Sequence, residues 1–299
     1  MNWPSDYSRR LGLASAVQRR GVGLHSGEDC LVRLLPGKHP GFRVAWLDQP
    51  QGLPVLLHPQ QVRDARLCTA LAIGDRRLAT VEHLLAALAG TGLTQVEIWV
   101  EGEEIPLLDG SALPWVEAIA EAGIEDLGPR EPLPPLAKPI SFQQGSSFVS
   151  ALPSDRLLLS AAIEFPQAAI GRQLFSLELN PAAFVAEVAP ARTFGFRDQV
   201  EQLQAAGLIR GGALSNALVC DGDQWLNPPL RFADEPVRHK LLDLIGDLAL
   251  VGLPRAQVLA FRGSHDLHTK LAAALASSTP CSLPARNDRS HQSDHPQVA

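Results

Sequence analysis

Prolines divide this chain of 299 residues into two halves. Proline fixes φ and lacks the backbone donor that helices and inner strands need, so a cluster of prolines ends both kinds of element. Proline-rich segments behave as semi-rigid spacers. We therefore expect a first domain over 1–128, a linker over 129–139 and a second domain over 140–276, each long enough for its own core. The linker contains Pro129, Pro132, Pro134, Pro135 and Pro139.

The two halves share a rhythm of several strand-like runs followed by a long helix with an apolar face. No repeat is visible residue by residue, so the rhythm only suggests a duplicated fold. Residues 277–299 are polar and unpatterned, which predicts a disordered tail. Strand-like runs of the first half are expected at 30–35, 42–46, 55–57 and 69–73, and those of the second half at 140–142, 147–151 and 157–165.

The run 238–247 (RHKLLDLIGD) has the pattern of an amphipathic helix. At 100° per residue, His239, Asp243 and Asp247 fall within an arc of about 80°, with Lys240 beside them and the leucines opposite. A histidine and an aspartate four residues apart can converge on one bound cation. A surface helix whose polar stripe faces water would show the same pattern. On this segment alone both interpretations stay open.

The run 80–90 (TVEHLLAALAG) predicts a second helix, with Thr80 as its N-cap and Gly90 as its stop. Its body is apolar all the way round, as in a buried helix. Glu82 and His83 then lie in the first turn of a buried helix, where ionisable groups are costly unless compensated. A core histidine satisfied by a hydrogen bond is one explanation. We favour chemistry, with one residue holding a metal and the other moving a proton.

Together His83, His239 and Asp243 form a set of two histidines and one aspartate. Three protein ligands leave one coordination position open for water, as in catalytic rather than structural zinc sites. Glu82, next to a ligand, would be a general base for that water. A further candidate is His265, which follows the predicted strand 258–261 in a loop that contains glycine.

Charge and cysteine usage narrow the class of protein. The net charge of −6 offers no basic face for nucleic acid. The four cysteines include no CxxC pair, which fits a reducing compartment better than a disulfide framework. No stretch has the roughly 20 apolar residues of a membrane span, and none resembles a signal peptide. We expect a soluble, cytoplasmic protein without a transmembrane segment.

Five motifs in order resemble the UDP-3-O-acyl-N-acetylglucosamine deacetylase family, from about residue 21 to about 276. They are 21–27 (GVGLHSG), 80–84 (TVEHL), 106–111 (PLLDGS), 191–196 (ARTFGF) and 238–243 (RHKLLD). The resemblance implies an α+β fold of two similar two-layer α/β sandwich domains packed together, with the active site between them. It implies zinc-dependent hydrolysis of the N-acetyl group of UDP-3-O-acyl-N-acetylglucosamine, giving UDP-3-O-acyl-glucosamine and acetate in lipid A biosynthesis.

The resemblance also implies a role for each matched residue. His83, His239 and Asp243 would bind zinc, and Glu82 would be the base. His265, oriented by Asp247, would be the cationic acid, while Thr193 would bind the oxyanion and Lys240 would assist at the substrate. Asp266 and His268 depart from the family's commoner residues, so a swap of roles between His265 and His268 stays open. An apolar passage for the acyl chain would be lined by Phe194, Phe196, Leu203, Leu208, Gly212 and Leu214.

Two other classes compete with a zinc amidase. A non-catalytic metal or sugar-nucleotide binding protein on the same scaffold would not need Glu82. A metalloprotease would need a ligand motif such as HExxH, which the sequence does not contain. The ligand set also suits Fe²⁺, because nitrogen and oxygen donors select weakly between these metals. A monomer is favoured, although neither the oligomeric state nor the acyl-chain length follows from the sequence.

Overall fold

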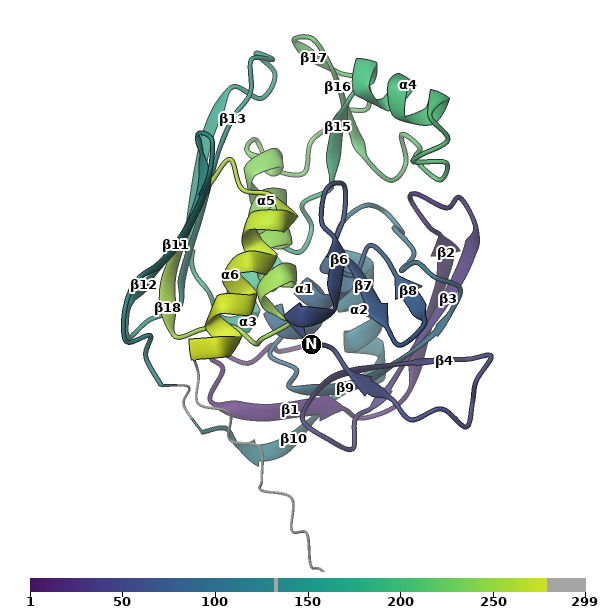
Figure 1. The fold of residues 1–299 in the computed structure, drawn as a ribbon, viewed down its shortest axis with the longest axis vertical. Helices are drawn as coiled ribbons and strands as arrows, with labels where there is room; N and C mark the ends of the chain where they lie inside the picture. The colour runs from purple at the N-terminus through teal and green to yellow at the C-terminus, as the bar shows by residue number, and fades with distance from the viewer. Residues whose placement is uncertain (132–133, 279–299) are drawn as a thin grey trace, which may run out of the picture.

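The computed structural model describes residues 1–131 and 134–278. Two five-stranded sheets stand on opposite sides of a group of helices (Figure 1). The segment 129–139 joins the two sheets in sequence, so each sheet takes all its strands from one half of the chain. The division into domains at this linker stays a prediction.

The two large sheets have the same strand order. In each, the last strand in sequence inserts between the second and the third and pairs in parallel with the third, while all other pairs are antiparallel. The first sheet contains, in spatial order, β2 (Val17–Val22), β3 (Asp29–Pro36), β9 (Gln95–Glu101), β4 (Gly41–Trp46) and β5 (Val55–Leu56). The second contains β11 (Ile140–Gln144), β12 (Ser147–Pro153), β18 (Ala256–Phe261), β13 (Leu158–Glu164) and β14 (Arg172–Glu178).

This shared order confirms the predicted α+β fold with two similar halves. The sheets present alternating apolar side chains to the helices, as the burial of alternate residues of β3 and β18 shows. A single apolar core therefore runs from one sheet through the helices to the other. The helices are α1 (Glu82–Gly90), α2 (Leu113–Ala122), α3 (Pro181–Glu187), α4 (Arg197–Ala205), α5 (Glu235–Leu248) and α6 (His265–Ser278).

Helices α1 and α5 pack directly against each other between the sheets (Figure 1). All nine residues of α1 are buried, as predicted for a helix that is apolar all round. At the crossing, the backbone of α5 at Gly246 touches the backbone of α1 at Glu82. A Cβ on Gly246 would lie only 2.1 Å from the carbonyl oxygen of Glu82, so no larger residue fits there. Glycine at this point lets the two helices approach at the residue that carries the predicted base.

Three smaller elements complete the fold. The ends of the first half meet in a two-stranded sheet, β1 (Arg9–Leu13) with β10 (Ile124–Pro129). A short helix, η1 (Pro59–Gln61), precedes a three-stranded sheet of β6 (Val62–Asp64), β7 (Ala70–Ile73) and β8 (Arg76–Leu78). A second three-stranded sheet, of β15 (Phe194–Phe196), β16 (Leu218–Asp221) and β17 (Gln224–Trp225), extends with α4 beyond the helices at the top of Figure 1.

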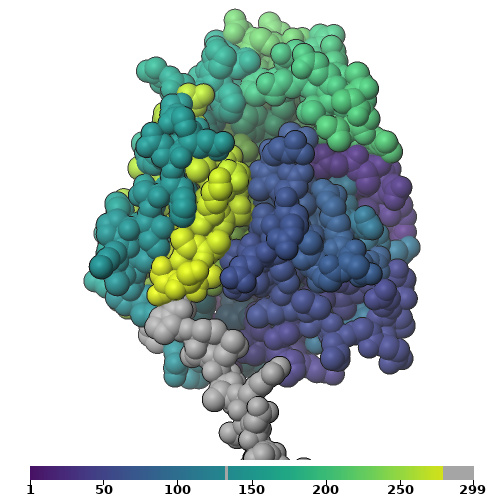
Figure 2. Space-filling view, in the orientation of Figure 1, coloured from purple at the N-terminus to yellow at the C-terminus, as the bar shows by residue number. Residues whose placement is uncertain are grey.

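This extension rests on the glycine-rich segment 21–27 of the first half. The two regions form adjacent green and purple surfaces in Figure 2. The backbone amide of Gly211 donates to the carbonyl of Leu24 at 3.0 Å. A Cβ on Gly211 would lie 2.2 Å from the carbonyl oxygen of Gly23, so a larger residue would separate the two segments. Motif 21–27 thus supports the loop predicted to line the acyl passage.

Several predicted boundaries differ from the structure. Thr80 is not a helix cap: its φ is 57°, its hydroxyl donates to Glu104 at 2.8 Å, and α1 begins two residues later. Gly90 is still helical, and the glycine with positive φ is Gly92. Helix α6 runs to Ser278, two residues into the predicted tail, and 279–299 lie outside the described residues. No helix of 1–131 or 134–278 is long and apolar enough to cross a membrane.

Candidate active site

The first His₂Asp set consists of His83, His239 and Asp243. Helix α1 supplies His83 and α5 supplies the other two, and all three side chains are buried. The Nε2 atoms of His83 and His239 lie 3.8 Å and 3.3 Å from the same oxygen of Asp243, Oδ1. The two rings meet edge to face with centroids 4.9 Å apart. Three donor atoms from two helices therefore converge on one point.

The chemistry of these donors fits a divalent cation. His239 donates its Nδ1 proton to the carbonyl of Ala191 at 3.0 Å, which leaves the Nε2 lone pair free to bind a metal. Burial, and then the neighbouring His239, lower the pKa of His83 to about 3, so its imidazole is neutral at pH 7. Burial acts to raise the pKa of Asp243, but Lys240 and His239 outweigh it and hold that pKa well below its usual value.

Lys240 completes this set from the solvent side. Its Nζ donates to Asp243 Oδ2 at 2.7 Å, so the other carboxylate oxygen is the one that faces the imidazoles. Burial acts to lower the pKa of Lys240, but Asp243 raises it above its usual value and the ammonium stays charged. The same Nζ lies 5.7 Å from the ring centre of Phe194. Lys240 thus connects the set to the start of the predicted acyl passage.

Glu82 lies beside the first set with its carboxylate enclosed. The backbone amide of Thr69 donates to Oε2 at 3.1 Å, and His265 Nε2 lies 3.8 Å from Oε1. Burial raises the pKa of Glu82 to about 7. A carboxyl group in this range exchanges a proton readily at neutral pH, as a general base must.

The second His₂Asp set consists of Asp247, His265 and His268. Asp247 lies one turn after Asp243 on α5, and both histidines come from the first turn of α6. Oδ2 of Asp247 accepts from Nδ1 of His265 at 2.9 Å and from Nδ1 of His268 at 3.0 Å. Burial would lower the pKa of His265, but Asp247 and Glu82 raise it to about 10, so this imidazole is a cation at pH 7.

The polar stripe of 238–247 therefore faces the interior. The interpretation of this segment as a surface helix is wrong, because α1 and α6 cover the stripe and leave His239, Asp243 and Asp247 at most 2% exposed. The sequence alone shows one helix and not what packs on it. His265 was expected in a loop, and it is instead the first residue of α6.

Thr193 lies two residues after Ala191, whose carbonyl accepts the hydrogen bond from His239. Its backbone amide donates to Gly110, and its side-chain hydroxyl has no hydrogen-bond partner among the residues that the structure describes. The segment is anchored by its neighbour Arg192, which forms an ion pair with the fully buried Glu235 at 2.8 Å. Motif 191–196 is thus held by α5, the helix that carries His239.

The residues predicted for the acyl passage all lie between residues 194 and 214 and differ in exposure. Phe194 and Phe196 pack with Phe165, with ring centres 5.7 Å and 5.2 Å from it. Leu208 and Leu214 are 40% and 54% exposed. The two remaining predicted residues are partly buried, on α4 (Leu203) and in the loop after it (Gly212).

Thr69 is a residue of the candidate site whose position the sequence did not reveal. It precedes β7, and its hydroxyl donates to Asp247 Oδ1 at 2.5 Å while its amide donates to Glu82. One residue thus holds the carboxylates of both the predicted base, Glu82, and Asp247, the residue predicted to orient the acid. A single threonine at a strand end carries no sequence pattern, and only the approach of α5 gives it this position.

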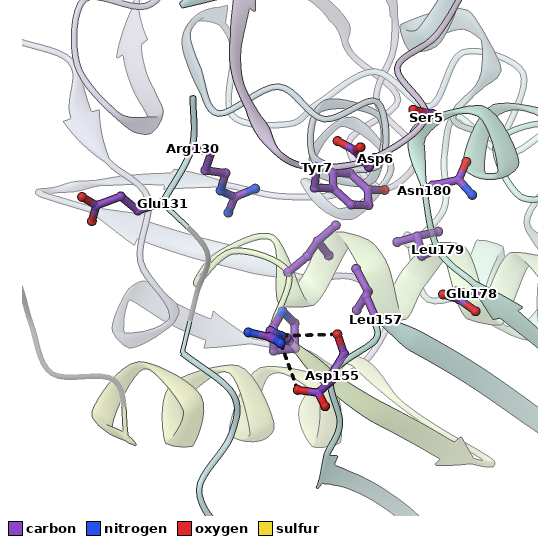
Figure 3. Close-up of a pocket in the computed structure, with 13 residues that line it drawn as sticks. Ser5, Asp6, Tyr7, Arg130, Glu131, Asp155, Leu157, Glu178, Leu179 and Asn180 are labelled. Atoms are coloured by element: carbon purple, nitrogen blue, oxygen red, sulfur yellow. Dashed lines mark hydrogen bonds and ion pairs between the residues drawn. The ribbon is translucent and has the colours of Figure 1, made fainter. Parts of the chain in front are cut away.

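A cavity of about 560 Å³ lies elsewhere, between the start of the chain and the second sheet (Figure 3). None of the residues of either His₂Asp set lines it. Its charged groups oppose one another, as in the ion pair between Arg255 and Asp155 at 2.9 Å. It therefore shows no preference for one class of ligand.

Comparisons with known proteins match most of the chain to one family. The sequence profile of a family described as UDP-3-O-acyl N-acetylglycosamine deacetylase matches residues 10–277. A UDP-3-O-acyl-N-acetylglucosamine deacetylase of Thermosynechococcus vestitus is 49% identical over 88% of this chain and 93% of its own length. One of Myxococcus xanthus is 38% identical over 95% of this chain and 91% of its own. A probable mitochondrial member of Arabidopsis thaliana is 38% identical over 87% and 86%.

Proposed function

The chain belongs to the UDP-3-O-acyl-N-acetylglucosamine deacetylase family, and on that premise we propose which of its residues perform the deacetylation. The reaction converts UDP-3-O-acyl-N-acetylglucosamine and water into UDP-3-O-acyl-glucosamine and acetate, a step of lipid A biosynthesis. One observation carries the assignment. The three convergent donor atoms of the first His₂Asp set lie beside a buried glutamate that faces a cationic histidine.

The metal we propose is Zn²⁺, held by His83 Nε2, His239 Nε2 and Asp243 Oδ1. Two imidazoles and one carboxylate are a common catalytic zinc set. Such an ion lowers the pKa of water and polarises an amide carbonyl. Fe²⁺ would accept the same ligands.

Glu82 is the proposed general base. Its pKa of about 7 allows it to take a proton from the attacking water at neutral pH. Thr69 fixes the carboxylate through the hydrogen bond to Oε2, which leaves Oε1 as the oxygen that faces His265. The base is therefore oriented before substrate binds.

His265 is the proposed general acid. It is a cation whose Nδ1 is bound to Asp247, so the proton on Nε2 is the one directed toward Glu82 and the reacting amide. That proton goes to the nitrogen of the leaving amine as the C–N bond breaks. The free hydroxyl of Thr193 would donate to the developing oxyanion, and Lys240 would add positive charge there.

The extension around β15 and α4 is the proposed binding region for the 3-O-acyl chain. Exposed leucines such as Leu208 and Leu214 cost little in the absence of substrate and gain about 0.8 kcal/mol for each CH₂ group that they cover. The predicted cytoplasmic location and monomeric state belong to the same proposal. Cytoplasmic placement rests on the cysteine usage of the sequence.

Acetate release tests the function and the metal together. Purified protein is incubated with a UDP-3-O-acyl-N-acetylglucosamine, then chelated, then supplied with Zn²⁺. We expect release that stops on chelation and returns with the ion. Glu82→Gln should retain zinc and substrate binding while turnover collapses. Wild-type protein that binds zinc but releases no acetate from any acyl length would instead favour the non-catalytic binding protein.

A further inference from the structure

We propose that His268 is a positioning residue of the acid, donating to the same Asp247 oxygen that holds His265 without itself reaching the substrate. The inference rests on the proposed function, because it assigns His265 as the acid. It also gives different roles to His265 and His268, the two histidines of α6 whose roles the sequence does not distinguish. The two have different environments despite lying three residues apart on one helix.

The shared oxygen fixes the direction of both hydrogen bonds. Burial acts to raise the pKa of Asp247, but His265 and His268 outweigh it and keep this carboxylate ionised. An ionised carboxylate can only accept hydrogen bonds. Both imidazoles must therefore present Nδ1–H to Oδ2, at 2.9 Å and 3.0 Å. Thr69 occupies the other oxygen, so Asp247 is held by three donors.

The opposite nitrogens of the two rings point to different places. Nε2 of His265 lies 3.8 Å from Glu82 Oε1, on the side of the first His₂Asp set. Nε2 of His268 is buried without a hydrogen-bond partner in the described part of the chain. It lies against Gly263, where a Cβ would be 2.4 Å away. Glycine at that position makes room for the ring, and His268 is only 1% exposed.

The second donor changes how strongly Asp247 holds the proton of His265. The charged groups around His265 are Asp247 and Asp243 from α5 and Glu82 from α1, with His83 nearby. A hydrogen bond from His268 withdraws negative charge from the Asp247 oxygen, so the imidazolium of His265 is stabilised less. His265 then donates its proton more easily, and its ring keeps one orientation.

Two substitutions of His268 separate the hydrogen bond from the packing. His268→Leu keeps an apolar side chain of similar size but removes the donor. His268→Asn keeps a donor, because its amide nitrogen is attached to Cγ as Nδ1 is in histidine. We expect kcat to fall on the order of tenfold in the leucine variant, with KM unchanged, and to stay close to wild type in the asparagine variant. Thermal unfolding of both variants reports the packing separately.

A second readout does not depend on turnover. In metal-loaded protein labelled with ¹⁵N in histidine, the signals of His265 report its protonation directly. We expect them to titrate at higher pH in His268→Leu than in wild type, and at the wild-type pH in His268→Asn. A purely structural role for His268 would lower the unfolding temperature without moving this titration.

Gly263→Ala should disturb the position of the His268 ring without replacing any ionisable residue, and it therefore serves as an independent test of the same hydrogen bond. The added Cβ would displace the ring of His268, so kcat and the titration should change as in His268→Leu. Asparagine lacks Nε2, so Gly263→Ala should add no further loss in the His268→Asn background. Equal losses in both backgrounds would overturn the inference.

Other results also decide against it. A wild-type kcat and an unshifted titration in His268→Leu would mean that the hydrogen bond has no influence on His265. A loss as large as that of His265→Gln would make His268 the acid itself. If wild-type protein releases no acetate, the proposed function fails, and the titration still decides whether His268 acts on His265 through Asp247.

Discussion

Two sets of one aspartate and two histidines lie one turn apart on α5, and they are prepared for different chemistry. In the first, His83 and His239 turn Nε2 toward Asp243 at distances of 3.8 Å and 3.3 Å. In the second, His265 and His268 turn Nδ1 toward Asp247 at 2.9 Å and 3.0 Å. The residue types are identical. In the first set, however, the nitrogen lone pairs converge on one point, whereas in the second set both histidines donate hydrogen bonds to the aspartate.

The difference comes from the groups that bind the remaining imidazole nitrogen and the remaining carboxylate oxygen in each set. In the first set the carbonyl of Ala191 takes the Nδ1 proton of His239, and Lys240 takes Oδ2 of Asp243. Lone pairs then face inward, where a cation can bind. In the second set the protons face the carboxylate, and His265 is left with a positive charge. Neighbouring groups, rather than residue identity, therefore distinguish the proposed metal ligands from the proposed acid.

The largest effect should come from removing an inward-facing lone pair. His239→Ala leaves two donors in the first set and should lower turnover by at least about a thousandfold, because the metal is lost with the ligand. Metal analysis after gel filtration should show a stoichiometry well below that of wild type. Full metal content in this variant would contradict the assignment of the first His₂Asp set as the metal site.

The next effect isolates the second set. His265→Gln should lower kcat by about a hundredfold or more, which is the range for loss of a positioned acid. Metal content should remain that of wild type, in contrast to His239→Ala. The two measurements on the same protein sample distinguish an acid from a ligand. Loss of the metal in His265→Gln would mean that the two sets are not separate.

The pH dependence of turnover sharpens the same distinction. The pKa of His265 is raised to about 10, so the cation is present below that pH and is lost as the pH rises through it. We expect kcat/KM to fall on the alkaline side near pH 10 in wild type. In His265→Gln the residual activity should lack this fall. A fall that persists in the variant would assign the alkaline limb to another group.

The smallest effect concerns the residue that connects Glu82 and Asp247. Thr69→Val removes the hydroxyl donor to Asp247 but keeps the backbone donor to Glu82. The free energy of unfolding should fall by about 1.5–3 kcal/mol, as for other hydrogen bonds to a charged group, and kcat by a few-fold. Thr69→Ser keeps the hydroxyl and serves as the control. Denaturant unfolding and acetate release measured on both variants check this.

The sequence predicted the local parts of the site well and their surroundings poorly. The spacing of His239, Asp243 and Asp247 placed them on one stripe of a helix, as they are. It did not show that α1 and α6 would bury that stripe, because burial depends on helices that are distant in sequence. Thr80 looked like a cap because threonine often is one, but the buried Glu104 binds its hydroxyl instead. Long-range contacts of this kind leave no local pattern.

The same limit explains the second set. The spacing placed Asp247 on the polar stripe, and the family resemblance gave it one partner, His265. That it also binds His268 and Thr69 follows from the approach of α6 and β7, which join residues up to 178 positions apart. The duplicated strand order was suggested by the rhythm of the two halves. It became definite only when the last strand of each sheet was found between the second and third.

The close crossing of α1 and α5 at Gly246 limits how the two halves of such proteins can be exchanged between relatives. Its missing side chain lets the backbone of α5 touch the carbonyl of Glu82. The alignment of the proposed base and acid therefore depends in part on this contact between segments encoded far apart. A chimaera that joins this first half to the second half of a relative would inherit that alignment only if the crossing is reproduced. The halves look alike, but they are not interchangeable parts.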